Sequence, residues 1–123
     1  ELCRKLTRPF GDLITVDLGD SVGFLRNWAQ AHSGTPIDLL YLDSLDYPVA
    51  PKDGPREPSQ QHCLAELDAA LPSLAPRAIV LIDDADLPGG GKARFARERL
   101  AQLGWRCDLD DYQTLWAHDE SNR

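Results

Sequence analysis

The chain has 123 residues, of which 42% are apolar and 27% charged, and its formal net charge is −7. This length and composition indicate one folded domain with a single core, and they exclude a disordered chain. The acidic balance argues against nucleic acid as a partner, because phosphate binding needs clustered lysines and arginines. No apolar run approaches the roughly 20 residues that cross a bilayer, so no membrane partner is expected.

Cysteine usage bears on the compartment. The three cysteines, Cys3, Cys63 and Cys107, are odd in number and far apart, and the sequence has no Cys-x-x-Cys pair. No basic segment followed by an apolar one opens the sequence, as a secretory signal would require. We therefore expect free thiols in a reducing, cytoplasmic compartment and no structural zinc.

The first third of the chain predicts a strand, a helix and a second strand. Residues 13–18 are rich in branched side chains and predict the first strand. Asp20 or Ser21 then caps a helix over residues 21–32, where apolar residues recur at helical spacing. Residues 37–43 form a nearly continuous apolar run that ends in an acid, as expected of a strand covered on both faces.

The middle of the chain predicts a loop, a helix, a strand and a further helix. Residues 44–58 contain four prolines and predict a long loop, which in a compact domain is usually functional or disordered. A helix begins at Ser59, and Pro72 bends or ends it. Residues 78–84 predict another buried strand, and residues 91–104 predict a helix closed by its last glycine.

The order of these elements decides the fold class. Residues 105–118 predict two short strands joined by a turn, so the full order is β-α-β-α-β-α-β-β. Such alternation predicts an α/β domain with a mostly parallel sheet and helices packed on its faces. We expect one domain over residues 1–123, with a three-layer, Rossmann-like sheet and a C-terminal antiparallel hairpin.

Acidic residues gather where the predicted strands end. Asp43 ends one strand, and Asp83 and Asp84 end the next. The carboxyl ends of neighbouring strands in an open α/β sheet share one edge, and ligands bind there. Crowded carboxylates repel one another, so either these acids point into water or a positive charge lies among them. Because Mg²⁺ and Ca²⁺ prefer carboxylate oxygens, we favour a divalent cation.

Other polar residues have simpler explanations. Asp20 and Asp46 stand at turns, where aspartates commonly cap helices or bind nearby backbone groups. The basic residues that begin at Lys92 indicate a solvated face of the last helix. Tyr47, in the proline-rich loop, is the aromatic residue that we expect to face a substrate.

The middle of the chain reads IDLLYLDSLDYP and then HCLAELDAALPSLAPRAIVLIDDAD, and a Gly-Trp pair follows. This series resembles the C-terminal half of the class I S-adenosylmethionine-dependent methyltransferases. The similarity is greatest to small-molecule O-methyltransferases of the catechol and of the sugar or macrolide type. The resemblance implies O-methyl transfer to a small hydroxylated molecule, with S-adenosylmethionine as cofactor and a divalent cation such as Mg²⁺.

The resemblance also implies roles for individual residues. The metal-dependent members hold Mg²⁺ with the acids at the positions of Asp43, Asp83 and Asp84. Catechol-type members carry a lysine three residues beyond the first of these acids. Asp46 fills that position here and becomes the candidate catalytic base.

The cofactor site is where the sequence departs from the family. By the resemblance, Asp20 or Ser21 would lie beside the adenine of the cofactor. The family's glycine-rich loop and ribose-binding acid should precede residue 13, and no such segment stands there. We therefore expect a truncated methyltransferase-like domain that works with a second copy of itself or with a separate N-terminal half. The alternative is a non-catalytic α/β binding or interaction module that retains only the scaffold.

Overall fold

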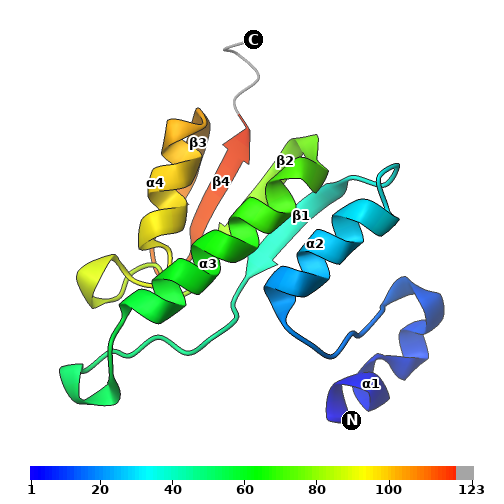
Figure 1. The fold of residues 1–123 in the computed structure, drawn as a ribbon, viewed down its shortest axis with the longest axis horizontal. Coiled ribbons are helices and arrows are strands. Elements are labelled where there is room, and N and C mark those ends of the chain that lie inside the picture. The colour runs from blue at the N-terminus through cyan, green and yellow to red at the C-terminus, as the bar shows by residue number, and fades with distance from the viewer. Residues whose placement is uncertain (119–123) are drawn as a thin grey trace.

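The computed structural model describes residues 1–118 and shows an α/β domain built on a four-stranded mixed sheet (Figure 1). The strands are β1 (Ile37–Leu42), β2 (Leu74–Ile82), β3 (Trp105–Asp110) and β4 (Thr114–His118). They stand in the order β1-β2-β4-β3. β1 and β2 are parallel, whereas β4 runs antiparallel to both of its neighbours.

Helices form a second layer beside this sheet. The α-helices of the described part are α1 (Leu2–Thr7), α2 (Ser21–Ala31), α3 (Glu57–Ala70) and α4 (Arg94–Gln102). The short 3₁₀ segments are η1 (Arg8–Leu13), η2 (Pro51–Asp53), η3 (Leu71–Ser73) and η4 (Pro88–Gly90). α2, α3 and α4 lie side by side, whereas α1 lies apart from the sheet (Figure 1). No helix within residues 1–118 has the length and apolar character needed to cross a membrane.

A single core lies between the helix layer and the sheet. β2 supplies Val80 and Ile82, which are fully buried because this inner strand has a neighbour on each side. α3 supplies Leu67 and α4 supplies Leu100, both also fully buried. The core therefore joins the two helices to the middle of the sheet and holds the ends of β1 and β2 in place.

The opposite face of the sheet has no helix layer among residues 1–118. Leu39 and Tyr41 of β1 and Ile79 of β2 alternate with buried neighbours and are exposed. The expected α/β class and C-terminal hairpin are confirmed. The sheet is mixed, with β1 and β2 as its parallel pair and β4 antiparallel to both of its neighbours, so the mostly parallel, three-layer Rossmann-like arrangement is not confirmed.

The first predicted strand, residues 13–18, is absent. η1 ends at Leu13, and the segment that follows as far as Asp20 has no regular structure. Leu13 and Leu18 are 88% and 97% exposed. Strand propensity is largely a preference for packing against neighbouring strands, and no described strand pairs with the outer edge of β1. The branched side chains of this segment therefore have no sheet to join.

The other predicted elements are present, with shifted ends. Asp20 caps α2, since its Oδ2 accepts a hydrogen bond from the backbone N–H of Gly23 at 2.8 Å. α3 ends at Ala70, and Pro72 lies in the 3₁₀ turn that follows, as its ring and missing N–H predict. β2 begins earlier than expected, at Leu74.

Candidate functional site

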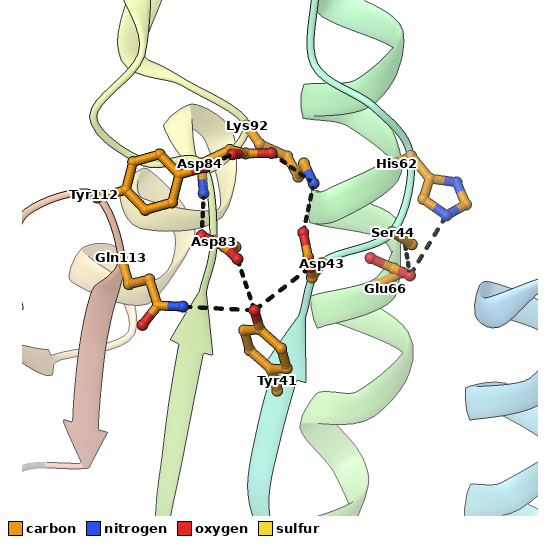
Figure 2. A network of polar contacts seen from close by, with 10 residues as sticks. All are labelled: Tyr41, Asp43, Ser44, His62, Glu66, Asp83, Asp84, Lys92, Tyr112 and Gln113. Carbon is orange, nitrogen blue, oxygen red and sulfur yellow. Dashed lines mark hydrogen bonds and ion pairs between the residues drawn. The ribbon is translucent and has the colours of Figure 1, made fainter. Parts of the chain in front are cut away.

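The ends of β1 and β2 bring three acids to one edge of the sheet (Figure 2). Asp43 directly follows β1, and Asp83 and Asp84 directly follow β2. The backbone N–H of Asp83 donates to the carbonyl oxygen of Leu42 at 3.1 Å, so the two strands stay paired up to the acids. The three carboxylates therefore lie together, as their strand-end positions predicted.

A buried lysine lies among these acids. The side chain of Lys92 is 2% exposed, and its Nζ is 3.2 Å from Asp43 Oδ1 and 3.2 Å from Asp84 Oδ2. Burial alone would lower the pKa of Lys92, but its hydrogen bonds to the two acids and their charges outweigh burial and raise that pKa above 10.5. Lys92 is an ammonium at neutral pH, so it supplies the positive charge that crowded carboxylates require.

Two tyrosine hydroxyls complete this polar network. Tyr41 donates to Asp83 Oδ2 at 2.7 Å, and Tyr112 donates to Asp84 Oδ1 at 2.7 Å. The backbone N–H of Asp84 donates to Asp83 Oδ1 at 2.9 Å. The Tyr41 hydrogen bond is the main cause of a lowered pKa at Asp83. We call Tyr41, Asp43, Asp83, Asp84, Lys92 and Tyr112 the acidic edge.

We expect Tyr41 and Tyr112 to ionise with a pKa of about 12, because each hydroxyl donates to a carboxylate that would repel the phenolate. Tyrosinate absorbance followed against pH measures both values. Replacing Asp83 with asparagine should bring the pKa of Tyr41 back towards 10.0 and leave Tyr112 raised. If both tyrosines ionised near 10.0 in the unaltered chain, the two hydrogen bonds would not exist in solution.

A glycine-rich loop positions Lys92. The backbone N–H of Lys92 donates to the carbonyl oxygen of Asp84 at 3.0 Å, and the preceding Gly91 has a φ of +62°. Gln60 of α3 is buried and its Nε2 donates to the carbonyl oxygens of Gly89 at 3.1 Å and Gly91 at 2.9 Å. The loop is therefore fixed to α3 on one side and to the end of β2 on the other.

Tyr47 supports the same loop. It is buried, and its hydroxyl donates to the carbonyl oxygen of Pro88 at 2.6 Å. Arg56 folds the proline-rich loop back on itself by donating to the carbonyl oxygens of Pro48 and Val49. The expectation that Tyr47 faces a substrate is therefore wrong, because burying the ring and satisfying its hydroxyl stabilise the interior position.

Lys92 is the residue that sequence reasoning missed. The basic pattern placed it on the solvated face of a helix, but α4 begins only at Arg94 and Lys92 is buried. A signal was present in the sequence, since three glycines directly precede this lysine and three acids stand a few residues earlier. Crowded carboxylates need a cation, and a flexible glycine run can turn a nearby lysine back onto them.

A second polar chain runs from α2 to the end of β1. Ser21 Oγ and His62 Nε2 share a hydrogen bond of 3.0 Å, and His62 Nε2 lies 3.5 Å from Glu66 Oε1. Ser44 donates to the same Glu66 oxygen, and Glu66 is 3% exposed (Figure 2). Because Ser21 and Glu66 approach the same ring nitrogen, this group ties α2 to α3 and lacks the order of a catalytic triad.

No protein-family model, curated protein or solved structure matches the chain. The function therefore has to be argued from the residues that the fold brings together. Those are an acidic edge with a fixed ammonium and two tyrosine hydroxyls, placed where an α/β sheet presents its ligands.

The acidic edge, as arranged, does not fit a divalent cation. Mg²⁺ and Ca²⁺ need oxygens at about 2.0–2.6 Å, and the Lys92 ammonium takes the place between Asp43 and Asp84 that such an ion would need. Within residues 1–118 no three His, Cys, Asp or Glu side chains are grouped so as to hold a metal. Asp43, Asp83 and Asp84 as metal ligands remain a prediction that metal titration must test.

The predicted cofactor residues lie at the start of α2. Asp20 is engaged as the helix cap and Ser21 with His62, so both side chains have structural partners. Beside them is a cavity of about 240 Å³ that is smaller than the roughly 300–1,000 Å³ of typical small-molecule sites. Asp17, Ser21 and Phe24 are among the residues that line it.

Asp46 is not part of the hydrogen-bond and ion-pair network of the acidic edge. It is exposed in the loop after β1, and no described hydrogen bond or ion pair within residues 1–118 joins it to Asp43, Asp83 or Asp84. Its assignment as catalytic base remains a prediction. Asp43, whose side chain is 46% exposed, is the carboxylate of the network that a ligand reaches most easily.

Proposed function

We propose that this chain is an S-adenosylmethionine-dependent methyltransferase-like domain of the Rossmann-like type that acts on a small hydroxylated molecule by O-methyl transfer. The observation that carries the proposal is the acidic edge, because carboxylates and hydroxyls at the carboxyl ends of a parallel strand pair suit a polyhydroxylated acceptor. In the methyltransferases that the chain resembles an antiparallel strand ends the sheet, and β4 likewise runs antiparallel to both of its neighbours.

The acidic edge offers an acceptor molecule both kinds of hydrogen-bonding group. Asp43 and Asp84 are partly exposed and accept hydrogen bonds from hydroxyl groups. Tyr41 and Tyr112 are exposed at the same edge, and each hydroxyl has an oxygen that can accept. A molecule with neighbouring hydroxyls can therefore be held in one orientation by several contacts.

We assign proton removal to Asp43 of this edge or to Asp46 in the loop that follows β1. When bound, the cofactor supplies an electrophilic methyl group on a sulfonium. Attack of the acceptor oxygen on that methyl group would break the methyl–sulfur bond and leave S-adenosylhomocysteine, while Asp43 or Asp46 would take the hydroxyl proton. The Lys92 ammonium keeps Asp43 and Asp84 close together despite their like charges.

Part of the cofactor site is expected to come from another polypeptide segment. The outer edge of β1 has no strand partner within residues 1–118, and α2 lies beside that edge (Figure 1). Large apolar side chains of these elements are exposed, among them Phe24 of α2, Leu39 of β1 and Leu18 of the segment before α2. Unpaired strand edges invite association, so a separate N-terminal half or a second copy of the chain would pair with β1.

A calorimetric titration of the chain with S-adenosylhomocysteine tests the proposed function. With a second copy of the chain completing the site, we expect saturable binding with a Kd of about 10 µM to 100 µM. Asp17→Asn, in the cavity beside Ser21, should weaken binding several-fold, whereas Asp38→Asn, an exposed acid of β1 outside the cavity, should not. No heat at millimolar ligand would contradict the proposal for this chain.

The second candidate is a non-catalytic α/β binding or interaction module. It is favoured by the structural engagement of Asp20, Ser21 and Lys92, each of which holds the fold together through its side chain. The two candidates differ in the titration above. Absence of cofactor binding, with the acidic edge intact by tyrosine absorbance, would favour the module.

A further inference from the structure

We propose that Lys92 is a built-in cation that takes the place of a divalent metal between Asp43 and Asp84. The acidic edge would then work without a metal ion. Only the statement that methyl transfer needs no metal rests on the proposed function. The exclusion of a metal ion from this space follows from the positions of Lys92, Asp43 and Asp84.

The position of the ammonium carries the argument. Lys92 Nζ lies 3.2 Å from one oxygen of Asp43 and 3.2 Å from one oxygen of Asp84. A divalent ion between these two residues would need the same two oxygens at about 2.0–2.6 Å. The two cations cannot occupy this space together. The ammonium has the advantage that it is part of the chain and does not have to bind from solution.

The surroundings of Lys92 prevent it from leaving. Its side chain is 2% exposed, so moving the ammonium away would either bury it unpaired or open the structure. The backbone of Lys92 is bonded to Asp84, and Gln60 holds the carbonyl oxygens of Gly89 and Gly91. A metal ion would therefore compete with a lysine that is held in place by its own loop.

The remaining acid is also engaged. Asp83 accepts from the Tyr41 hydroxyl through one oxygen and from the Asp84 backbone through the other. Each carboxylate of the acidic edge thus has at least one partner from within the chain. A hydroxylated ligand would meet a fixed ammonium and carboxylates here, and methyl transfer would be insensitive to chelators.

Manganese titration, followed by the electron paramagnetic resonance signal of free Mn²⁺, tests this inference without cofactor or substrate. We expect the unaltered chain and Lys92→Arg to leave millimolar Mn²⁺ free. Lys92→Met removes the ammonium and should bind Mn²⁺ about tenfold or more tightly than the unaltered chain. Adding Asp43→Asn to Lys92→Met should abolish the gain, and Lys52→Met, at an exposed lysine, should cause none.

Two results would overturn the inference. The first is saturable, submillimolar Mn²⁺ binding by the unaltered chain that Asp84→Asn abolishes. The second is a folded Lys92→Met chain, by circular dichroism, that gains no Mn²⁺ binding; Lys92→Gln serves if the methionine variant does not fold. Failure of cofactor binding in the calorimetric titration would leave both readouts unaffected, so the two proposals fail separately.

Discussion

Gly91→Ala is expected to lower the free energy of unfolding by about 3–5 kcal/mol, because the added methyl group meets backbone atoms. A Cβ at this position would lie 2.2 Å from the carbonyl oxygen of Asp84 and 2.6 Å from that of Ala85. The backbone cannot yield without breaking the hydrogen bond from Lys92 to Asp84. Urea denaturation followed by tryptophan fluorescence measures the loss.

Gly104→Ala is the matched control for this substitution. Gly104 has a φ of +82°, so alanine there is strained in the same way, but within residues 1–118 no atom other than those of its chain neighbours lies within 4 Å of the added Cβ. Its loss should be only about 1 kcal/mol, the usual cost of a positive φ in a residue other than glycine. Equal losses at the two positions would contradict the close approach of Gly91 to Asp84 and Ala85.

Lys92→Met is expected to lower the free energy of unfolding at neutral pH by about 2–4 kcal/mol, since it leaves Asp43 and Asp84 together without their ammonium. The difference from the unaltered chain should shrink at strongly alkaline pH, where the Lys92 ammonium of the unaltered chain loses its proton. Chemical denaturation repeated across pH measures this difference.

The raised pKa of Lys92 determines how the stability of the fold changes at alkaline pH. Folding favours the ammonium, so its contribution is complete below the ordinary value of 10.5 and is lost as the pH rises through the raised value. Asp83, whose pKa is lowered, contributes to stability above its ordinary value of 3.8 and loses that contribution as the pH falls.

Lys52→Met, at an exposed site, should change stability by less than about 0.5 kcal/mol. A loss for Lys92→Met that is the same at every pH would contradict the ion pairs.

The fold was predictable where local pattern and tertiary packing agree. The apolar runs that became β1 and β2 and the capped helix after Asp20 follow from side-chain pattern alone. Residues 13–18 carry an equally good strand pattern and form none, because a strand also needs a neighbour. The alternation of strands and helices led us to expect three layers, but the helices among residues 1–118 cover one face only, because alternation does not decide which face each helix covers.

The site was predictable only in part. The strand ends located Asp43, Asp83 and Asp84, because parallel strands deliver their carboxyl ends to one edge. Lys92 and Asp43 are 49 positions apart in the sequence, and a periodic pattern does not predict a contact between residues so far apart. The contact between Tyr112 and Asp84, which are 28 positions apart, could not be predicted for the same reason.

Nitrogen-15 NMR of the lysine ammonium groups at neutral pH shows directly whether Lys92 is a buried ammonium among the acids. The chain has only three lysines, Lys5, Lys52 and Lys92, and the first two are exposed. Exposed ammonium protons exchange rapidly with water, so we expect one protected signal, from Lys92, that shifts in Asp43→Asn and in Asp84→Asn. Three equivalent, rapidly exchanging lysines would contradict a buried ammonium at the acidic edge.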